Sequence, residues 1–400
     1  MKTFIIMVFI LYSTSIVFSA PGDLIWKYKT ENIIGSSPSV SDIAVFFGGY
    51  DTYIYSLHTS DGSLLWRYKT GEVIPSSPFL HGDFLYIGSS DNFIYAINKT
   101  DGELRWRYQT GGDVFSSPFV FAETVYIGSN DNYLYALNTS DGSMEWRYQT
   151  GNDIFSSPYV TNSIICFGSR DFYIYALNTS DGILKWKYLT DGSIDSSPFI
   201  SNGVVYIGNK SNHVYCINED NGTPKWIYLT GGSVDSSPFV LNNIVYIGCS
   251  DSYLYAINAS TGEFKWRYKS GGAIGSSPFA DEEEVFFGSF DTYVYSLTCS
   301  DGSLKWRYKT RTIKVISPNG GELWEVGSIY DITWTSENVD SVSIKFTSDG
   351  GSLWTEIVKM SSNEGKYSWT IPDTPSDNCL VRIDDIKDNA TDTSDSTFTI

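Results

Sequence analysis

A tryptophan recurs at a fixed step of 40 residues along most of this 400-residue chain. The eight positions are Trp26, Trp66, Trp106, Trp146, Trp186, Trp226, Trp266 and Trp306. Serine, proline, glycine and tyrosine recur at fixed phases between them, so residues 24–310 contain seven copies of one short unit. Such a unit cannot bury both of its own faces and must stack on its neighbours. The period therefore predicts a repeat architecture.

Each unit contains four short runs of aromatic and β-branched residues, separated by Gly, Asn, Asp and Ser. In the third copy the last three runs are residues 125–129, 133–138 and 146–148. No run has the period of a helix, and all four have the composition of β-strands. Four strands in about 40 residues are typical of a propeller blade. We predict an all-β chain whose main part, residues 21–310, is a seven-bladed β-propeller of four-stranded repeats.

Proline and glycine support this assignment. A proline stands at the start of the first run of every unit, and proline is tolerated only on an edge strand because it has no backbone N–H. We expect this strand to lie beside the central channel. Asp-Gly pairs such as Asp141-Gly142 mark the tight turn between the third and fourth strands. The prolines are Pro38, Pro78, Pro118, Pro158, Pro198, Pro238 and Pro278.

The residues around this turn resemble the PQQ-type repeat of the quinoprotein propellers. The family pattern is Ala-x-Asp-x-x-Thr-Gly-x-x-x-Trp, and Ala256, Asn258, Thr261, Gly262 and Trp266 depart from it only by Asn for Asp. The resemblance implies the propeller fold and a docking role for the tryptophans from Trp66 to Trp306. Quinoprotein dehydrogenases also use eight blades, adjacent cysteines and long insertions with calcium ligands. This sequence has no Cys-Cys pair and no insertion in any unit, so we expect no cofactor.

The N-terminus and the charge point to export. Residues 1–20 carry Lys2, an apolar stretch and small residues near Ser19, as in a cleaved secretory signal; an uncleaved anchor is the alternative. No later stretch is long and apolar enough to span a membrane. The net charge of −19 excludes nucleic acid as a partner, because phosphates would be repelled. We expect a monomer that is secreted or lies on the extracellular surface.

The cysteines and the glycosylation sequons give little information about the fold or the function. Four of the five cysteines replace other residues at scattered phases of the repeat, so we predict no disulfide framework. Seven sequons are present, four of them at one repeat phase where Asn also suits a turn, and the sequence leaves glycosylation open. The four are Asn98, Asn138, Asn178 and Asn258, and the others are Asn209, Asn221 and Asn389.

From residue 311 to residue 400 the repeat is replaced by alternating runs that predict a β-sandwich. The segment from Ser317 to Trp324 resembles the start of immunoglobulin-like modules of secreted cell-wall and surface-layer proteins. We expect Trp324, Trp334 and Trp369 to lie in the sandwich core rather than to form a sugar platform.

No catalytic constellation can be assembled from the sequence. The three histidines, His58, His81 and His213, stand at different repeat phases, so their spacing predicts neither a metal site nor a base paired with a nucleophile. We therefore predict a protein that is not an enzyme. A PQQ-dependent oxidoreductase and a purely structural component of the cell envelope remain the alternatives.

Comparison of the seven copies predicts where a partner would bind. Two loops vary from copy to copy on what we expect to be one propeller face: the loop before each first strand and the loop between the second and third strands. We predict that this face binds a protein or a cell-surface polysaccharide, its carboxylates taking cationic groups and its aromatic side an apolar or sugar face; neutral drift of solvated loops is the alternative. The candidates are Tyr50, Asp113, Phe115, Asp153, Phe155, Arg170, Asp195, Lys210, Asp235 and Phe290.

Two features concern the backbone. An aspartate recurs between the second and third runs and is lost only at Ser211, which favours a residue that caps the turn. The sequence contains eight tryptophan runs, but seven units have only seven fourth strands. We predict that the Trp306 run completes the last sheet and that the Trp26 run lies beside it as an additional edge strand.

Overall fold

The computed structural model describes residues 25–309, 311–360, 362–386 and 390–400. It divides into two compact units, residues 1–308 and 309–400. Residues 1–20, for which we predict a secretory signal, lie outside the described residues, as does the sequon at Asn389. No helix among the described residues has the length and apolar character needed to cross a membrane.

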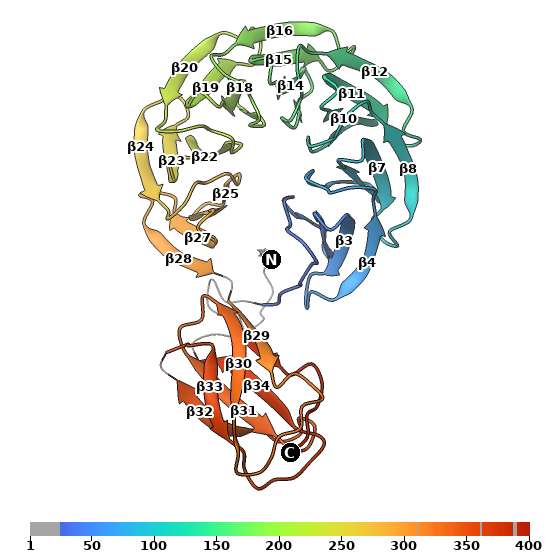
Figure 1. Cartoon of the computed structure of the whole chain (residues 1–400). Coiled ribbons are helices and arrows are strands. Elements are labelled where there is room, and N and C mark those ends of the chain that lie inside the picture. Colours follow the sequence, from blue (N-terminus) through green and yellow to red (C-terminus); the bar gives the residue numbers. More distant parts are fainter. Residues whose placement is uncertain (1–24, 310, 361, 387–389) are drawn as a thin grey trace. The chain divides into compact units, whose positions relative to one another are not determined.

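The first unit consists of seven antiparallel sheets of four strands each, arranged around a central axis (Figure 1). The first four sheets contain β1 (Ser39–Val40), β2 (Ala44–Gly48), β3 (Tyr53–His58), β4 (Leu64–Lys69); β5 (Phe79–His81), β6 (Phe84–Gly88), β7 (Phe93–Asn98), β8 (Leu104–Gln109); β9 (Phe119–Phe121), β10 (Thr124–Gly128), β11 (Tyr133–Asn138), β12 (Met144–Gln149); and β13 (Tyr159–Val160), β14 (Ile164–Gly168), β15 (Tyr173–Asn178), β16 (Leu184–Leu189). The other three contain β17 (Phe199–Ser201), β18 (Val204–Gly208), β19 (His213–Asn218), β20 (Pro224–Leu229); β21 (Phe239–Leu241), β22 (Ile244–Gly248), β23 (Tyr253–Asn258), β24 (Phe264–Lys269); and β25 (Phe279–Ala280), β26 (Glu284–Gly288), β27 (Tyr293–Thr298), β28 (Leu304–Lys309).

Within each sheet the strands pair in sequence order. The prolines directly precede the first strand, which is the inner edge of its sheet, and β4, β8, β12, β16, β20, β24 and β28 form the outer rim (Figure 1). This arrangement confirms the prediction of an all-β propeller built from four-stranded repeats.

The docking tryptophan joins each sheet to the next. Trp106 of β8 lies over the turn that precedes β12, where an added Cβ on Gly142 would stand 2.6 Å from the indole. Its Nε1–H donates to the carbonyl of Thr139 over 2.8 Å. Gly142 has a φ of +72°, and both this φ and the indole above it explain why glycine recurs there. The same ring-on-glycine contact pairs Trp26 with Gly62, Trp66 with Gly102, Trp146 with Gly182, Trp186 with Gly222, Trp226 with Gly262 and Trp266 with Gly302.

A second contact lies deeper between the sheets. Gly128 ends β10, and the side chain of Ile154, from the loop that leads into the next sheet, packs directly on it. A Cβ on Gly128 would lie 2.3 Å from Cγ2 of Ile154, so only glycine fits. Apolar clusters consequently combine neighbouring sheets: Tyr86 and Ile94 of the second sheet share one core with Val125 and Ile127 of the third.

The inner strands are linked by serines 40 residues apart. The amide of Ser77 donates to Oγ of Ser117 over 2.9 Å, and the same bond recurs from Ser37 to Ser277 in six steps. Beside this series, six aromatic rings follow one another with centroids 5.2–5.7 Å apart. These rings are Phe79, Phe119, Tyr159, Phe199, Phe239 and Phe279, and Ser39 holds the corresponding position in the first sheet.

The first and the last of the eight tryptophan runs lie at opposite ends of the series of sheets. Trp306 belongs to β28, the fourth strand of the last sheet, as predicted. The position predicted for Trp26 is wrong: residues 25–30 form no strand, and Trp26 packs on Gly62 of the first sheet, donating to the carbonyl of Thr59 over 2.7 Å. The indole finds its usual glycine turn there, whereas the last sheet already has a fourth strand.

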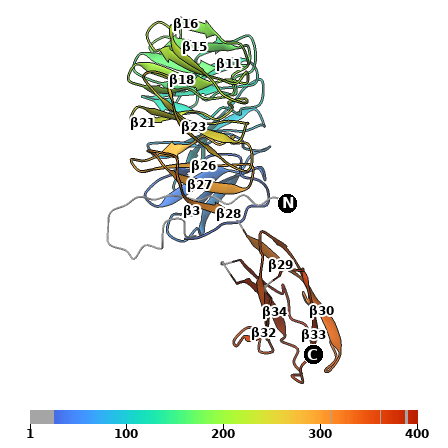
Figure 2. The same cartoon turned by 90° about the vertical axis from the view of Figure 1, so that its left-hand side faces the viewer.

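The C-terminal unit contains two antiparallel sheets around one core (Figure 2). Trp324, Trp334 and Trp369 are at most 8% exposed and lie in this core, as predicted. One sheet is ordered β29-β30-β33 and the other β32-β31-β34-β35. The strands are β29 (Thr312–Ser317), β30 (Ile329–Glu337), β31 (Val342–Thr347), β32 (Thr355–Met360), β33 (Lys366–Thr370), β34 (Leu380–Asp385) and β35 (Thr391–Thr393).

Candidate functional site

The two variable loops lie on one face because the backbone ties them together in every unit. The residue at the tip of the loop between the second and third strands donates its amide to the loop before the first strand. For example, Arg170 donates to the carbonyl of Asp153 over 3.0 Å, and Lys210 donates to Ser193 over 2.9 Å. All seven units make this bond.

The side chains of the two loops also meet, in pairs 15 residues apart. Arg170 lies over the ring of Phe155 with its guanidinium carbon 3.4 Å from the centroid, and Lys210 contacts Asp195. The bulky residues Tyr50 and Phe290 instead face Gly35 and Gly275, where an added Cβ would lie 2.6 Å and 3.3 Å from their rings, respectively. In these four units the two variable positions thus contact each other, as a cation on a ring, an ion pair, or a bulky ring against glycine.

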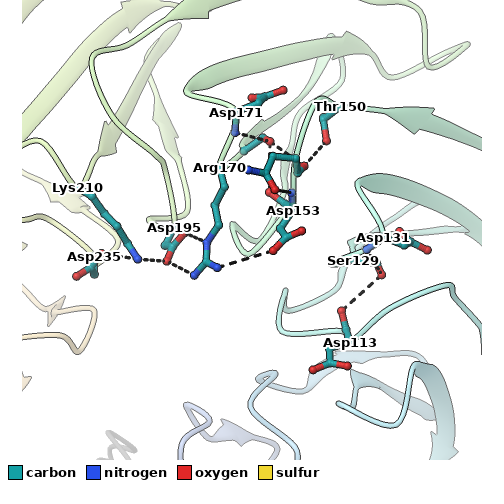
Figure 3. A network of polar contacts seen from close by, with 12 residues as sticks. Asp113, Ser129, Asp131, Thr150, Asp153, Arg170, Asp171, Asp195, Lys210 and Asp235 are labelled. Atoms are coloured by element: carbon teal, nitrogen blue, oxygen red, sulfur yellow. Dashed lines mark hydrogen bonds and ion pairs between the residues drawn. The ribbon is translucent and has the colours of Figure 1, made fainter.

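Charged residues of three neighbouring units form an ion-pair ladder (Figure 3), which we define as Asp153, Arg170, Asp195, Lys210 and Asp235. Arg170 binds Asp195 through two hydrogen bonds of 2.8 Å and lies 3.8 Å from Asp153. Lys210 lies 2.6 Å from Asp195 and 4.0 Å from Asp235. The ladder carries three carboxylates and two cations, so its net charge is −1.

The centre of the ladder is its most strongly held part. Asp195 is only 15% exposed at its side chain, whereas Asp235, at one end, is 44% exposed. Burial raises the pKa of the Asp195 carboxyl, but hydrogen bonds from Arg170 and Lys210 outweigh burial and bring this pKa below its ordinary value. The hydrogen bond to Asp195 in turn raises the pKa of the Arg170 guanidinium. Both pKa shifts favour the charged forms of Asp195 and Arg170, as expected for an ion pair.

A stack of aromatic rings adjoins the ladder. Phe115 and Phe155 are stacked with centroids 4.8 Å apart, and Arg170 covers the second ring. A guanidinium held between a ring and a carboxylate loses much of its rotational freedom. The face is thus rigid at this point.

The structure brings together some of the predicted site residues and separates others. The expectation that four carboxylates would be available to external cations needs correction, because Arg170 and Lys210 already pair with three of them. Asp113 lies apart from the ladder (Figure 3) and makes no ion pair with any described residue. Phe290, in the last unit, is 70% exposed.

The recurring aspartate of the variable loop caps its turn. Asp131 accepts the amide of Tyr133 at 3.1 Å and the hydroxyl of Tyr135 at 2.6 Å, and it also accepts the amide of Gly111. In the fifth unit Ser211 replaces this aspartate, and the carboxylate comes instead from Asp191, which stands where five other units have glycine. Tyr215 donates its hydroxyl to Asp191 over 2.8 Å.

Because Asp191 supplies the carboxylate that position 211 lacks, we expect that an aspartate at position 211 can compensate for the loss of Asp191. Asp191→Gly should lower the free energy of unfolding by about 1–3 kcal/mol, because the buried hydroxyl of Tyr215 and the amide of Asn209 lose their acceptor. Adding Ser211→Asp should restore most of the loss by recreating the arrangement of the other units. Denaturant unfolding followed by circular dichroism measures both variants. A double variant no more stable than Asp191→Gly would contradict the exchange.

A second asymmetry, on the outer strands, escaped the sequence analysis. At the ends of β16 and β20, Leu189 and Leu229 are 57% and 65% exposed, and Ile227 of β20 is 48% exposed. At the positions of the two leucines, the other units carry Lys or Gln. At the position of Ile227, all units except the fifth carry Arg or Lys. The same comparison of copies would have found these positions, had it been applied to the fourth strand.

Other candidate groups remain isolated. Among the described residues, no three of the His, Cys, Asp and Glu side chains lie close enough to hold one metal ion. All five cysteines are free. At three of the four in-phase sequons, Asn98, Asn138 and Asn258, the side-chain oxygen accepts the amide two residues ahead, so these asparagines cap the turn.

Comparisons with known proteins agree with this fold. A family model for the β-propeller of beta-alanine-activating enzyme matches residues 11–203. A second model, described as outer membrane protein assembly factor BamB, matches residues 190–312 and 229–381. No curated protein matches the sequence. The matches support the identification of the units as PQQ-like, BamB-type propeller repeats.

Solved structures show the same architecture at low sequence identity. BamB from Moraxella catarrhalis is 19% identical, with 70% of this chain and 91% of that chain covered and a TM-score of 0.62. The computationally designed Ika8 protein is 14% identical over 72% of this chain and 90% of its own, with a TM-score of 0.65. A europium-containing methanol dehydrogenase is 13% identical over 68% and 76%, with a TM-score of 0.58. At these identities the likeness concerns the fold alone.

Proposed function

We propose that this chain is a non-enzymatic binding protein of the cell envelope or the cell surface. Its seven-bladed propeller would present the face that carries the ion-pair ladder to a protein partner or a surface polysaccharide. The ladder is the observation on which the proposal depends. It occupies variable loop positions of adjacent units, on a scaffold whose tryptophan, glycine, serine and proline positions recur from copy to copy.

The contacts of the ladder define the chemistry of the partner. Asp195 is saturated by Arg170 and Lys210, so a lone cation gains little at the centre. The carboxylates of Asp235, which is more exposed than Asp195, and of Asp113 stand outside these strong pairs, and the edge of the Phe115–Phe155 stack adds apolar area. A partner with cationic groups at its ends and hydrogen-bonding groups between them fits this pattern. Because the side chains are held in place, little conformational entropy is lost on binding.

The remaining parts of the chain are consistent with an exported protein. The matching family model carries the name of an outer membrane protein assembly factor, which supports an envelope location and contacts between proteins. The C-terminal unit has strands one, two and five in one sheet and four, three, six and seven in the other. This division supports an immunoglobulin-like sandwich.

Binding to envelope components tests the proposal. The immobilised full chain is incubated with detergent-solubilised envelope proteins and, separately, with purified wall polysaccharide. The double variant Arg170→Gln, Lys210→Gln removes both cations of the ladder and leaves the rest of the face in place. We expect capture to fall about tenfold or more, the scale of a hot-spot loss.

A matched control removes the same charge elsewhere. Lys225 and Lys265 are exposed on the outer strands β20 and β24, so Lys225→Gln, Lys265→Gln changes the net charge equally but leaves the face intact. This control should capture as much as the unchanged chain. Equal capture by the ladder variant, or equal loss in the control, would contradict the proposal.

A further inference from the structure

The outer strand of the fifth sheet, β20, lacks a cation that every other outer strand carries. In the other six units the charged group of an Arg or Lys lies 4.2–4.6 Å from the centroid of the aromatic ring that begins the third strand, as Arg267 does with Tyr253. In the fifth unit both members of this pair are replaced, the cation by Ile227 and the ring by His213. With Leu229 at its end, β20 is the only one of the seven outer strands that is apolar at both positions.

The two apolar side chains are exposed on one face of β20. Ile227 is 48% and Leu229 is 65% exposed, and residues two apart on a strand point to the same side. Trp226 points to the other side and holds β20 on the sixth sheet, where its Nε1–H donates to the carbonyl of Ala259 over 2.9 Å. Charged side chains normally prevent an edge strand from pairing with another chain, and β20 lacks them at these two positions.

The backbone of β20 directs hydrogen-bonding groups outward at the same two residues. β20 is the last strand of its sheet, and no described strand pairs with its outer edge. The amide of Thr230 donates inward, to the carbonyl of Asn212 over 2.8 Å. Because the backbone groups of successive residues alternate in direction along a strand, those of Ile227 and Leu229 point outward. These two residues thus present apolar side chains together with backbone donors and acceptors, which is the chemistry that another β-strand matches.

We propose that β20 pairs with the same strand of a second copy of this chain, antiparallel and about a two-fold axis at Tyr228. In this register Ile227 lies opposite the partner's Leu229, and Leu229 lies opposite the partner's Ile227. Each of these two pairs exchanges two backbone hydrogen bonds and brings two apolar side chains together. The edge is therefore complementary to itself. Pro224, which has no N–H to donate, lies outside the paired segment.

The pairing joins two four-stranded sheets into one sheet of eight strands. Its contact is small, and interfaces below about 1,200 Å² are typical of transient complexes. We therefore expect an equilibrium between monomers and dimers that depends on concentration, in which the monomer expected from the sequence is one of the two states.

The pairing also sets the direction of the two loop faces. The C-terminal end of β20 leads to the loop before the next unit, which carries Asp235 of the ladder. Because the two β20 strands run in opposite directions, the two ladders of a dimer point away from each other. A dimer could then hold two partners on opposite sides. This consequence rests on the proposed function, whereas the pairing itself does not.

The mass of the full chain in solution tests the pairing. Sedimentation equilibrium is measured over a wide range of concentration at about 0.15 M salt, where a Debye length of ~8 Å screens the repulsion between chains of net charge −19. The variant Ile227→Arg, Leu229→Lys carries the residues of the first unit, Arg67 and Lys69, so it should fold normally. It places like charges opposite each other, and we expect the dissociation constant of the dimer to rise about tenfold or more.

A matched control adds the same two charges on other strands. Leu65→Arg, Leu189→Lys changes exposed positions of β4 and β16 where other units carry cations, and it leaves β20 intact. This control should dimerise as strongly as the unchanged chain. A chain that stays monomeric at every concentration would overturn the proposal and leave this edge to a strand of another protein. A dimer of undiminished strength in the β20 variant would overturn it as well.

Engineered cysteines test the register. Ile227→Cys and Leu229→Cys are prepared as separate proteins, mixed and treated with a mild oxidant. Residues directly opposite each other in a hydrogen-bonded antiparallel pair have Cα atoms about 5.5 Å apart, within the range of a disulfide, whereas diagonal neighbours lie about 7–8 Å apart. We expect the mixed disulfide to form severalfold faster than either disulfide between like chains. The unchanged chain, whose five cysteines are free, gives the background. Faster cross-linking between like chains would overturn this register.

Discussion

Trp106→Ala is expected to lower the free energy of unfolding by about 3–5 kcal/mol, the range for a buried tryptophan truncated to alanine. The indole is 8% exposed, covers Gly142 and packs against Tyr86 with centroids 5.8 Å apart. Its removal opens a cavity between two sheets that depend on each other for burial. Denaturant unfolding followed by far-ultraviolet circular dichroism measures the change without relying on tryptophan emission.

The conservative variant separates packing from hydrogen bonding. Trp106→Phe keeps much of the apolar contact but loses the N–H that donates to Thr139, and Tyr86 still donates its hydroxyl to the same carbonyl over 3.3 Å. We therefore expect a loss of about 1–2 kcal/mol, close to that of one hydrogen bond with minor repacking. A Trp106→Ala variant within 1 kcal/mol of the unchanged chain would contradict the docking role.

Gly128→Ala should lower the free energy of unfolding by about 1–3 kcal/mol, the usual cost of overpacking, although the change adds only one methyl group. Its Cβ would meet Cγ2 of Ile154 at 2.3 Å and the carbonyl oxygen of Ile154 at 2.9 Å. The backbone contact cannot be relieved by a rotamer change, so the two sheets must move apart. Thermal unfolding of the single variant measures this effect.

A double-mutant cycle provides the control for Gly128→Ala. Ile154→Ala alone should cost about 2–5 kcal/mol by leaving a cavity. In that background the shortest contact, with Cγ2 at 2.3 Å, is removed, while the contacts with Cβ and the carbonyl oxygen of residue 154 remain, so the combined loss should be smaller than the sum of the two single losses. Additive losses would mean that the two residues do not meet as described.

The sequence predicts the parts of this fold that repeat. The period of Trp106 and its equivalents, the Asp-Gly turns and the edge prolines each identify an element of the unit, because every copy must satisfy the same local and neighbouring contacts. The placement of Trp26 was not predictable in this way. It depends on which of two equivalent runs meets a given turn, and identical residues carry no information about that choice.

The site is less predictable than the fold for a related reason. The variable positions were visible in the sequence, but the pairing of Arg170 with Phe155 and of Lys210 with Asp195 follows from two loops lying side by side. The exchange of the carboxylate from position 211 to Asp191 moves it by 20 residues along the chain while its partner Tyr215 stays in place. Such compensation is a property of three-dimensional proximity. One part of the sequence does indicate that the two loops are in contact: the bulky residues Tyr50 and Phe290 each have a glycine 15 residues earlier.

The serine series that joins the inner strands has a genetic consequence. Each hydrogen bond of the series joins only neighbouring units, through serines 40 residues apart. The contacts between tryptophan and glycine also join only neighbouring units. Recombination that inserts or deletes one whole unit would therefore keep the same pairs of repeat positions next to each other in the remaining units. Recombination at this period would consequently change the number of units in this chain by whole units.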